Sequence, residues 1–152
     1  MSNICKIDAS QIDDILNNLN EENRKKAMIN SLVKGAEVLQ SETINKLRQK
    51  VTNSSSMEWG VKVGKDKDYL EAWVSILKDF RLKWFEMGTD ERYRKVRGIN
   101  DKGKKYVKKD VKGGYTGRMT ATHFFAEARE NTAPIESAII EAMEAELNKL
   151  MK

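Results

Sequence analysis

The chain has 152 residues and a net charge of +5, with 39% hydrophobic and 34% charged residues. A chain of this length suggests one domain, which can bury a core without disulfides or a structural metal. No apolar run approaches the roughly 20 residues that a membrane span needs, and the single cysteine, Cys5, excludes an internal disulfide.

Positive charge is concentrated in residues 90–118. This segment contains eleven Lys/Arg and four Asp/Glu residues, a balance of +7, whereas the rest of the chain has a balance of −2. Such a block is typical of a contact with a polyanion or of a solvated, mobile loop.

Residues 7–51 are predicted to be helical, with Asn20 either interrupting the helix or capping it anew. Apolar residues recur there at steps of three and four, which indicates one stripe of a long amphipathic helix. The stripe consists of Met28, Leu32, Ala36, Leu39, Thr43, Leu47 and Val51. Gly35 costs a helix about 1 kcal/mol relative to alanine, so its presence indicates close packing against a neighbouring element.

Residues 57–89 are predicted to form an antiparallel β-meander. Apolar and polar residues alternate across 59–63, as they do in a half-buried strand. Residues 69–77 are rich in aromatic and β-branched side chains and are predicted as a second strand, although they also fit one or two helical turns. Residues 81–87 are predicted as the third strand.

Residues 90–118 are predicted to be an extended loop or a long mobile hairpin, because glycines are interspersed among the lysines. Residues 122–152 then form a C-terminal helical segment. Asn131 or Thr132 is expected to cap its last helix, with Pro134 in the first turn, where a missing N–H costs little. The outer face of this helix is acidic and carries Glu136, Glu141 and Glu144.

Residues 1–152 are therefore expected to form a single α+β domain. In this arrangement an antiparallel sheet is packed by a long N-terminal helix and by a C-terminal helix. The long basic loop joins the sheet to the C-terminal segment.

The composition gives little support to catalysis. The only histidine, His123, and the only cysteine, Cys5, lie far apart in the sequence, so neither a nucleophilic pair nor a metal site is expected from them. A phosphate-binding loop requires glycines that follow a strand and open a helix. The glycines at positions 113, 114 and 117 do not stand in that order. We therefore predict no enzyme activity, no catalytic residue, no metal site and no cofactor.

Two polar residues lie beside aromatic ones. His123 is interpreted as a packed or capping histidine. Glu86 has two interpretations: an outward-facing strand residue, or a carboxylate that braces the turn. In the second case it is held by neighbouring backbone N–H groups or by an arginine such as Arg92.

Three interpretations of the basic segment stay open. It is a solvated loop, a contact for nucleic-acid phosphate with tyrosines that stack on bases, or a docking element for an acidic protein surface. The last helix of a neighbouring copy would supply such a surface. The predicted contact residues are Arg92, Arg94, Lys95, Arg97, Lys104, Lys105, Lys108, Lys109 and Lys112.

Two short motifs resemble the tail-component family of tailed bacteriophages. The family's Glu-containing strand end before Gly-Thr is matched by Phe85, Glu86, Met87, Gly88 and Thr89. Its aromatic entry to the last helix is matched by His123, Phe124, Phe125 and Ala128. The order of elements also matches from about residue 26 to residue 150. The family's Ala-Pro-x-Asp-Thr-Gly turn after the first long helix is replaced here by TNSSSMEWG.

The resemblance implies a head-to-tail joining or tail-completion protein of the neck of lambdoid siphophages and prophages. Such a protein is a structural component of the virion, assembled in the bacterial cytoplasm, and is expected to form a ring, commonly of six subunits. The implied partners are further copies of the chain, the connector or head-closure protein and the tail-tube protein. The function of the basic segment is not implied by the resemblance: in such a ring it would dock on the next subunit or make non-specific contact with packaged DNA. No membrane is involved.

Two alternatives to this function stay open. The first is a small nucleic-acid-binding protein that uses residues 92–118. The second is an enzyme, which would require Glu86, Arg92 and His123 to converge in one pocket.

Overall fold

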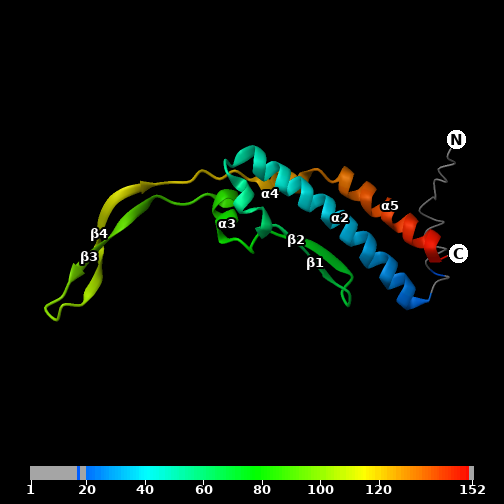
Figure 1. Ribbon diagram of the computed structural model, residues 1–152, viewed down its shortest axis with the longest axis horizontal. Helices are drawn as coiled ribbons and strands as arrows, with labels where there is room; N and C mark the ends of the chain where they lie inside the picture. The colour runs from blue at the N-terminus through cyan, green and yellow to red at the C-terminus, as the bar shows by residue number, and fades with distance from the viewer. Residues whose placement is uncertain (1–16, 18–19, 151–152) are drawn as a thin grey trace.

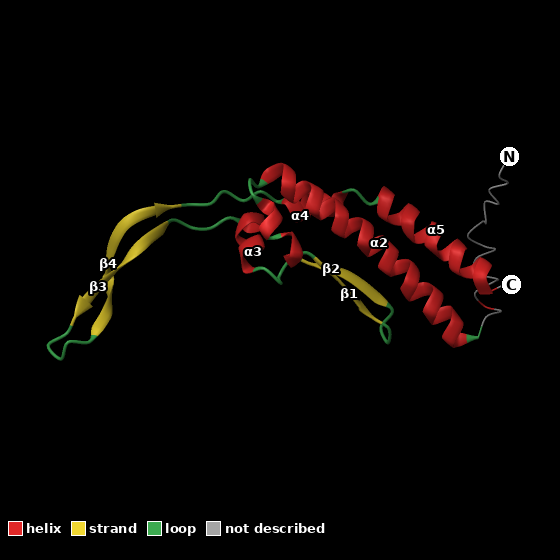
Figure 2. Ribbon diagram, viewed as in Figure 1, coloured by secondary structure: helices red, strands yellow, loops and turns green. Residues whose placement is uncertain are grey.

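The protein is described here by a computed structural model that covers residue 17 and residues 20–150. Its elements are α2 (Glu21–Lys50), the 3-10 helices η1 (Ser54–Ser56) and η2 (Glu58–Gly60), β1 (Lys62–Asp66), β2 (Glu71–Ser75), α3 (Phe80–Met87), β3 (Arg92–Ile99), β4 (Lys105–Gly117), α4 (Phe124–Glu130) and α5 (Ala133–Leu150). Figure 1 shows α5 running back alongside α2, with the β1–β2 hairpin below α2. The predicted α+β class is confirmed, as the colours in Figure 2 make plain.

Helix α2 begins after Asn20, whose side-chain oxygen accepts a hydrogen bond of 2.8 Å from the N–H of Asn23. The interpretation of Asn20 as a cap is therefore confirmed. Residues 7–16 and 18–19 of the predicted helix lie outside the described residues. Among the stripe residues, Ala36, Thr43 and Leu47 are buried, together with Val51 at the end of the helix. Met28, Leu32 and Leu39 are only half-buried. No helix in the described ranges is long and apolar enough to cross a membrane.

Helix α5 packs against α2 where Gly35 leaves room for it. A Cβ atom on Gly35 would lie only 2.5 Å from Cγ1 of Ile139, so the close packing predicted for this glycine is confirmed. At the start of α5, the carbonyl of Thr132 accepts a hydrogen bond of 2.9 Å from the N–H of Glu136. Pro134 lies in the first turn, as predicted.

The first two predicted strands form a separate antiparallel hairpin. The register runs from Lys62 opposite Ser75 to Asp66 opposite Glu71. The first strand begins later than predicted, because residues 58–60 form η2 and Val61 is buried ahead of the strand. The second strand lies inside the predicted range.

The predicted third strand is wrong, because these residues form helix α3. The side chain of Asp79 caps the helix by accepting a hydrogen bond of 3.0 Å from the N–H of Arg81, and Gly88 ends it with φ of +75°. Leu82 and Phe85, three positions apart, face the core. The opposite face is exposed and carries Phe80, Trp84 and Met87. In the described residues each sheet therefore has two strands, and no three-stranded meander forms.

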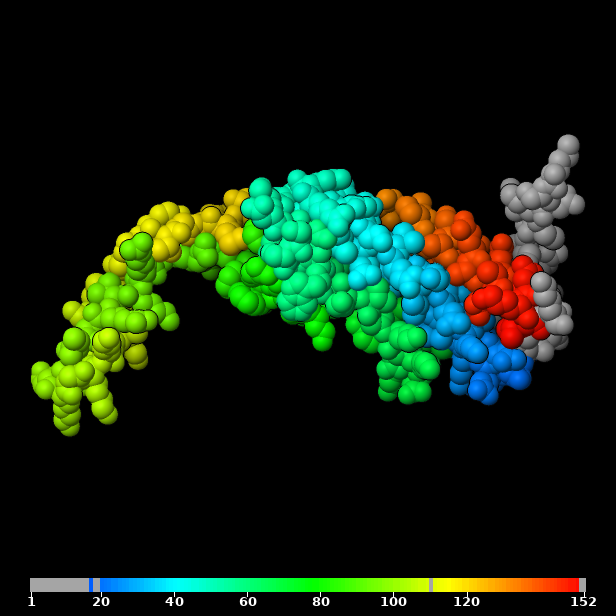
Figure 3. Space-filling model, viewed as in Figure 1, coloured from blue at the N-terminus to red at the C-terminus, as the bar shows by residue number. Residues whose placement is uncertain are grey.

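The hydrophobic core joins the end of α2 to α3 and α4. Its buried members are Leu47, Val51, Met57, Val61, Ile76, Leu82 and Phe124. The ion pair between Lys50 and Glu127 also ties the end of α2 to α4, and its hydrogen bond holds the pKa of Glu127 below the ordinary value. This core holds the two ends of the segment 90–118, which projects from the body in Figures 1 and 3.

Candidate functional site

Residues 90–118, hereafter the basic arm, leave and re-enter the body at one place. The N–H of Thr89 donates a hydrogen bond of 2.9 Å to the carbonyl of Met119. In return, the N–H of Met119 donates to the hydroxyl of Thr89 at 3.0 Å. A Cβ atom on Gly88 would lie 2.8 Å from the backbone of Met119 and of Ala121. Glycine is thus needed both for its positive φ and for this close approach.

Glu86 fastens α3 to the start of α4. Its two carboxylate oxygens accept hydrogen bonds from the N–H groups of Phe125 at 2.8 Å and Ala126 at 3.0 Å. A carboxylate at a helix N-terminus satisfies backbone donors that lack a partner within the helix, and its charge strengthens the bonds. The interpretation of Glu86 as a brace held by backbone N–H groups is confirmed, and that of an outward-facing strand residue is wrong. Arg92 is not among the partners that the structure gives to this carboxylate.

Further bonds join the same two elements. The N–H and the hydroxyl of Thr122 both donate to the carbonyl of Phe85, each at 2.8 Å. His123 donates its N–H to the carbonyl of Glu86 at 3.3 Å and has a positive φ of 51°. His123 is the N-cap residue of α4, so the prediction of a capping histidine is confirmed in position, although its side chain makes no capping bond. The side chain is exposed, so the alternative of a packed histidine is wrong. His123 occupies the cap position through its backbone alone.

The basic arm is an antiparallel hairpin of β3 and β4, so the prediction of a hairpin is confirmed and the alternative prediction of an extended loop is wrong. The pairing runs from Arg92 opposite Gly117 to Ile99 opposite Lys105, with irregular register between. At the tip, the side-chain oxygen of Asn100 accepts hydrogen bonds from the N–H groups of Lys102 and Lys104. Backbone pairing rather than an apolar core holds the arm, since most of its side chains are exposed.

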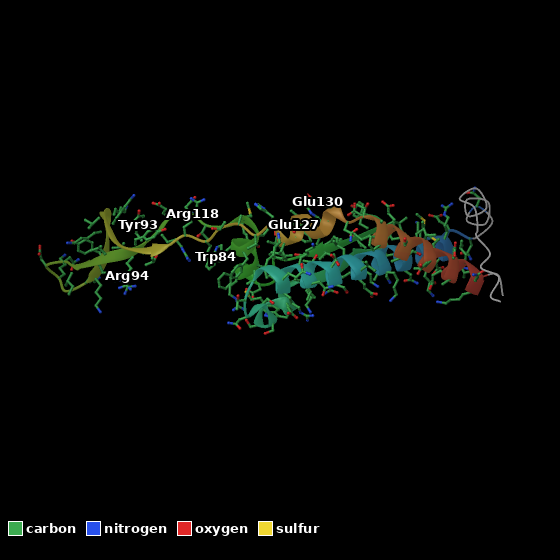
Figure 4. All side chains as sticks on the ribbon, turned by 90° about the horizontal axis from the view of Figure 1, so that it is seen from above. Trp84, Tyr93, Arg94, Arg118, Glu127 and Glu130 are labelled. Atoms are coloured by element: carbon green, nitrogen blue, oxygen red, sulfur yellow. The ribbon has the colours of Figure 1, made fainter. Side chains whose placement is uncertain are left out.

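Predicted contact residues are spread along the whole arm. Four lie in β3, four lie in β4, and Lys104 lies in the turn. Two cations that the prediction omitted, Lys102 and Arg118, belong to the same segment. None of these side chains forms an ion pair with a carboxylate that the structure describes. Figure 4 labels Arg94 on the hairpin, well to the left of the helices of the body.

Two lysines of the arm face each other directly. Lys95 lies opposite Lys112 in the register of the hairpin. Like charges opposite each other on paired strands destabilise the pairing, and an isolated two-stranded hairpin is only marginally stable in water. An anionic partner would relieve this repulsion and add a second layer to the hairpin.

Tyrosines of the arm already have partners within it. The rings of Tyr93 and Tyr115 meet edge to face, with centroids 5.5 Å apart. The Nζ atom of Lys112 lies 4.9 Å from the centre of the Tyr93 ring. The hydroxyl of Tyr93 donates to Glu91 at 2.9 Å, which raises the pKa of this tyrosine above its ordinary value. The ring of Tyr106 lies over Gly98.

An open groove of about 920 Å³ lies where the arm joins α3. Trp84 and Met87 of α3 line it together with Tyr93, Lys112 and Arg118 of the arm. Figure 4 labels Trp84 beside the base of the arm and Arg118 where the arm returns. The sequence prediction missed Trp84, although its spacing from Phe80 and Met87 fits one face of a helix.

The enzyme alternative receives no geometric support. The carboxylate of Glu86 is engaged by the start of α4, and the groove at the base of the arm is lined by none of Glu86, Arg92 and His123. Within residue 17 and residues 20–150, no group of three or more His, Cys, Asp or Glu side chains is placed to hold a metal ion.

The chain was compared with protein-family models, with curated proteins and with solved structures. No family model, curated protein or solved structure matches the chain.

Proposed function

We propose that this chain is a structural protein of a bacteriophage neck, which joins the head connector to the tail or completes the tail as a subunit of a ring. The observation that carries the proposal is the bond between Glu86 and the start of α4. The two motifs of the resemblance lie about forty residues apart in the sequence. Glu86 gives them a common physical role, because it belongs to one motif and caps the other.

The basic arm also supports an assembly role. It buries no core of its own, extends away from the body (Figure 3) and carries cations without described ionic partners. Such an element gains stability when another surface covers it. A ring subunit has that surface available in every neighbour.

The proposal is tested by mass measurement and by virion composition. Light scattering after size-exclusion chromatography would give the mass of the purified protein, alone and mixed with connector and tail-tube proteins of the same phage. Mass spectrometry would identify the chain in purified virions. We expect a closed oligomer and a fixed copy number per virion. A chain that stays monomeric in every mixture and is missing from virions would refute the proposal.

The second candidate is binding to nucleic acid through the basic arm, which is favoured by the cations that form no ion pair with a described carboxylate. Contact with phosphates releases counterions, so affinity for duplex DNA should fall steeply as salt rises. Replacing the lysines at positions 104, 105, 108 and 109 by glutamine should reduce the slope of that dependence. Fluorescence anisotropy with a duplex of random sequence would measure both. Absence of any salt-sensitive binding would remove this candidate.

A further inference from the structure

A second groove, hereafter the helix groove, runs between α2 and α5 on the body. It has a volume of about 780 Å³. Its floor is aliphatic and is formed by Val33, Val38, Ala138, Ala142 and Ala145. These side chains are half-buried, except that of Ala145, which is exposed. The groove therefore offers apolar contact area that this copy leaves uncovered.

The rim of the helix groove is acidic. Two of its carboxylates are paired locally, Glu37 with Lys34 at 2.7 Å and Glu146 with Lys149 at 2.8 Å. The two others, Glu42 and Glu141, form no ion pair with any residue in the described part of the chain. The rim therefore presents two uncompensated negative charges above an aliphatic floor.

The basic arm carries the complementary chemistry. Besides its cations it exposes aliphatic side chains: Ile99 is 68% exposed, Val107 45% and Val111 50%. Phosphate backbones make no use of aliphatic groups, whereas a groove with an apolar floor and a carboxylate rim uses both kinds of side chain. The rings of Tyr93 and Tyr115 also pack on each other, so they are not free to stack on nucleic-acid bases in this arrangement. These features favour a protein surface over nucleic acid as the occupant.

The arm points away from the helix groove of its own chain. In Figure 1 the hairpin leaves the body beyond α3, while α5 runs toward the opposite end of the molecule. The space-filling view in Figure 3 shows the same separation. An arm that meets such a groove must therefore meet it on another molecule. Each chain has one arm and one groove, and in the proposed ring the contact between them is head to tail and repeats.

We infer that the basic arm of one copy docks in the helix groove of a second copy, with its lysines facing Glu42 and Glu141 and its aliphatic side chains on the groove floor. This inference deepens the proposed ring function and rests on the subunit contact that the ring requires. The docked arm gains the second layer and the anionic neighbours that it lacks alone.

Two full-length variants test the contact. The groove variant combines Glu42→Lys with Glu141→Lys. The arm variant replaces the lysines at positions 104, 105, 108 and 109 by glutamine. A control variant combines Glu136→Lys with Glu144→Lys. These two substitutions change the net charge by the same amount as those of the groove variant, but both positions lie on α5 outside the groove lining. Circular dichroism confirms that each variant is folded before association is measured.

Sedimentation velocity measures whether the contact between arm and groove forms. We expect the groove variant and the arm variant each to self-associate at least about tenfold more weakly than the unaltered chain, and the control variant to associate normally. Mixing the two impaired variants should restore one contact, because one supplies an intact arm and the other an intact groove. The mixture should therefore stop at a one-to-one dimer. Adding Lys108→Glu and Lys109→Glu to the groove variant should recover association.

Several outcomes would overturn the inference. They are an unaltered chain that stays monomeric at its highest soluble concentration, a groove variant that assembles like the unaltered chain, and a mixture that forms no dimer. Arm substitutions that weaken DNA binding but leave assembly unchanged would assign the arm to nucleic acid instead. The proposed function fails separately. Arm-in-groove dimers from a chain that is missing from virions refute the neck role, whereas virion rings that tolerate the groove substitutions refute only the docking.

Discussion

The carboxylate of Glu86 and the backbone N–H of Phe125 are joined by a 2.8 Å hydrogen bond across 39 positions of sequence. This bond and its neighbour from Ala126 cap the first turn of α4. They also hold together the two elements from which the basic arm departs and to which it returns. Stability of the body and placement of the arm therefore depend on the same carboxylate.

Replacing Glu86 by alanine should lower the free energy of unfolding by about 1–2 kcal/mol, because two N–H groups at a helix start lose their acceptor. Glu86→Gln should cost less, since the amide oxygen still accepts one bond. Urea denaturation measures both. Glu130→Ala, at the exposed end of the same helix, serves as the matched control. Equal losses for Glu86→Ala and Glu130→Ala would contradict the capping role.

Gly35→Ala should destabilise the protein although alanine is the better helix former. Alanine gains about 1 kcal/mol in helix propensity. Its Cβ, however, would lie 2.5 Å from Cγ1 of Ile139, and overpacking of this kind costs about 1–3 kcal/mol. In the background of Ile139→Ala both contacts under 3.0 Å are gone and only Cγ2 of Ile135, at 3.3 Å, stays close, so Gly35→Ala should become stabilising. A double-mutant cycle in urea measures the reversal. The same sign in both backgrounds would count against close packing here.

Asp79 should contribute to the pH dependence of stability. Its side chain is only 3% exposed, and hydrogen bonding from Arg81 lowers its pKa from the ordinary value. A lowered pKa gives stability that is present above the unfolded-state pKa of about 3.9 and is lost as the pH falls through the folded-state pKa. The advantage of the unaltered chain over Asp79→Asn should therefore be constant near neutral pH and shrink on acidification.

Thermal melts of the two proteins at a series of pH values measure this difference. Arg81→Met removes the partner of Asp79 and should flatten the same part of the profile. An advantage that grows as the pH falls would have the wrong sign for a carboxylate with a lowered pKa.

Lys95→Glu should stabilise the hairpin of the isolated chain. The substitution replaces a repulsive cross-strand pair with an attractive one opposite Lys112, worth about 0.2–1 kcal/mol, and leaves Lys112 over the ring of Tyr93. Amide hydrogen exchange of β3 and β4 at low salt should slow. Lys102→Glu makes the same charge change in the turn and serves as control. Slowing of equal size in both variants would indicate a general charge effect rather than a specific pair.

The long helices are predictable from the sequence because their apolar and polar residues repeat with helical spacing over many residues. The apolar stripe of α2 and the acidic outer face of α5 extend over several helical turns. Period and burial agree in the second half of α2 at Ala36, Thr43 and Leu47, whereas in the first half Ala27 and Ile29 are buried in place of Met28. Helix α3 has only eight residues, and alternation around Trp84 fits a strand as well as a helix. The decisive signal was local: Asp79 before the segment and Gly88 after it are typical helix boundaries.

Features of the candidate site were harder to predict. Strand β4 contains glycines and lysines without an apolar face, and its order comes from backbone pairing with β3, which composition does not reveal. Glu86 had two interpretations because its role depends on where α4 packs, a tertiary property. The cations of the arm were predictable as a group. Two further properties can be seen only in the folded structure: none of these cations forms an ion pair with a described carboxylate, and the arm points away from the body.

The bonds between Thr89 and Met119 make the arm an insert whose two ends share one anchor. A doubling of loop length costs only about 0.6 kcal/mol in closure entropy, so the inserted segment can be lengthened, shortened or rewritten while the body keeps its path. Under the proposed docking, substitutions in the arm would change the surface that the arm binds, while substitutions in the body would change the free energy of unfolding. Binding specificity and stability would then evolve independently.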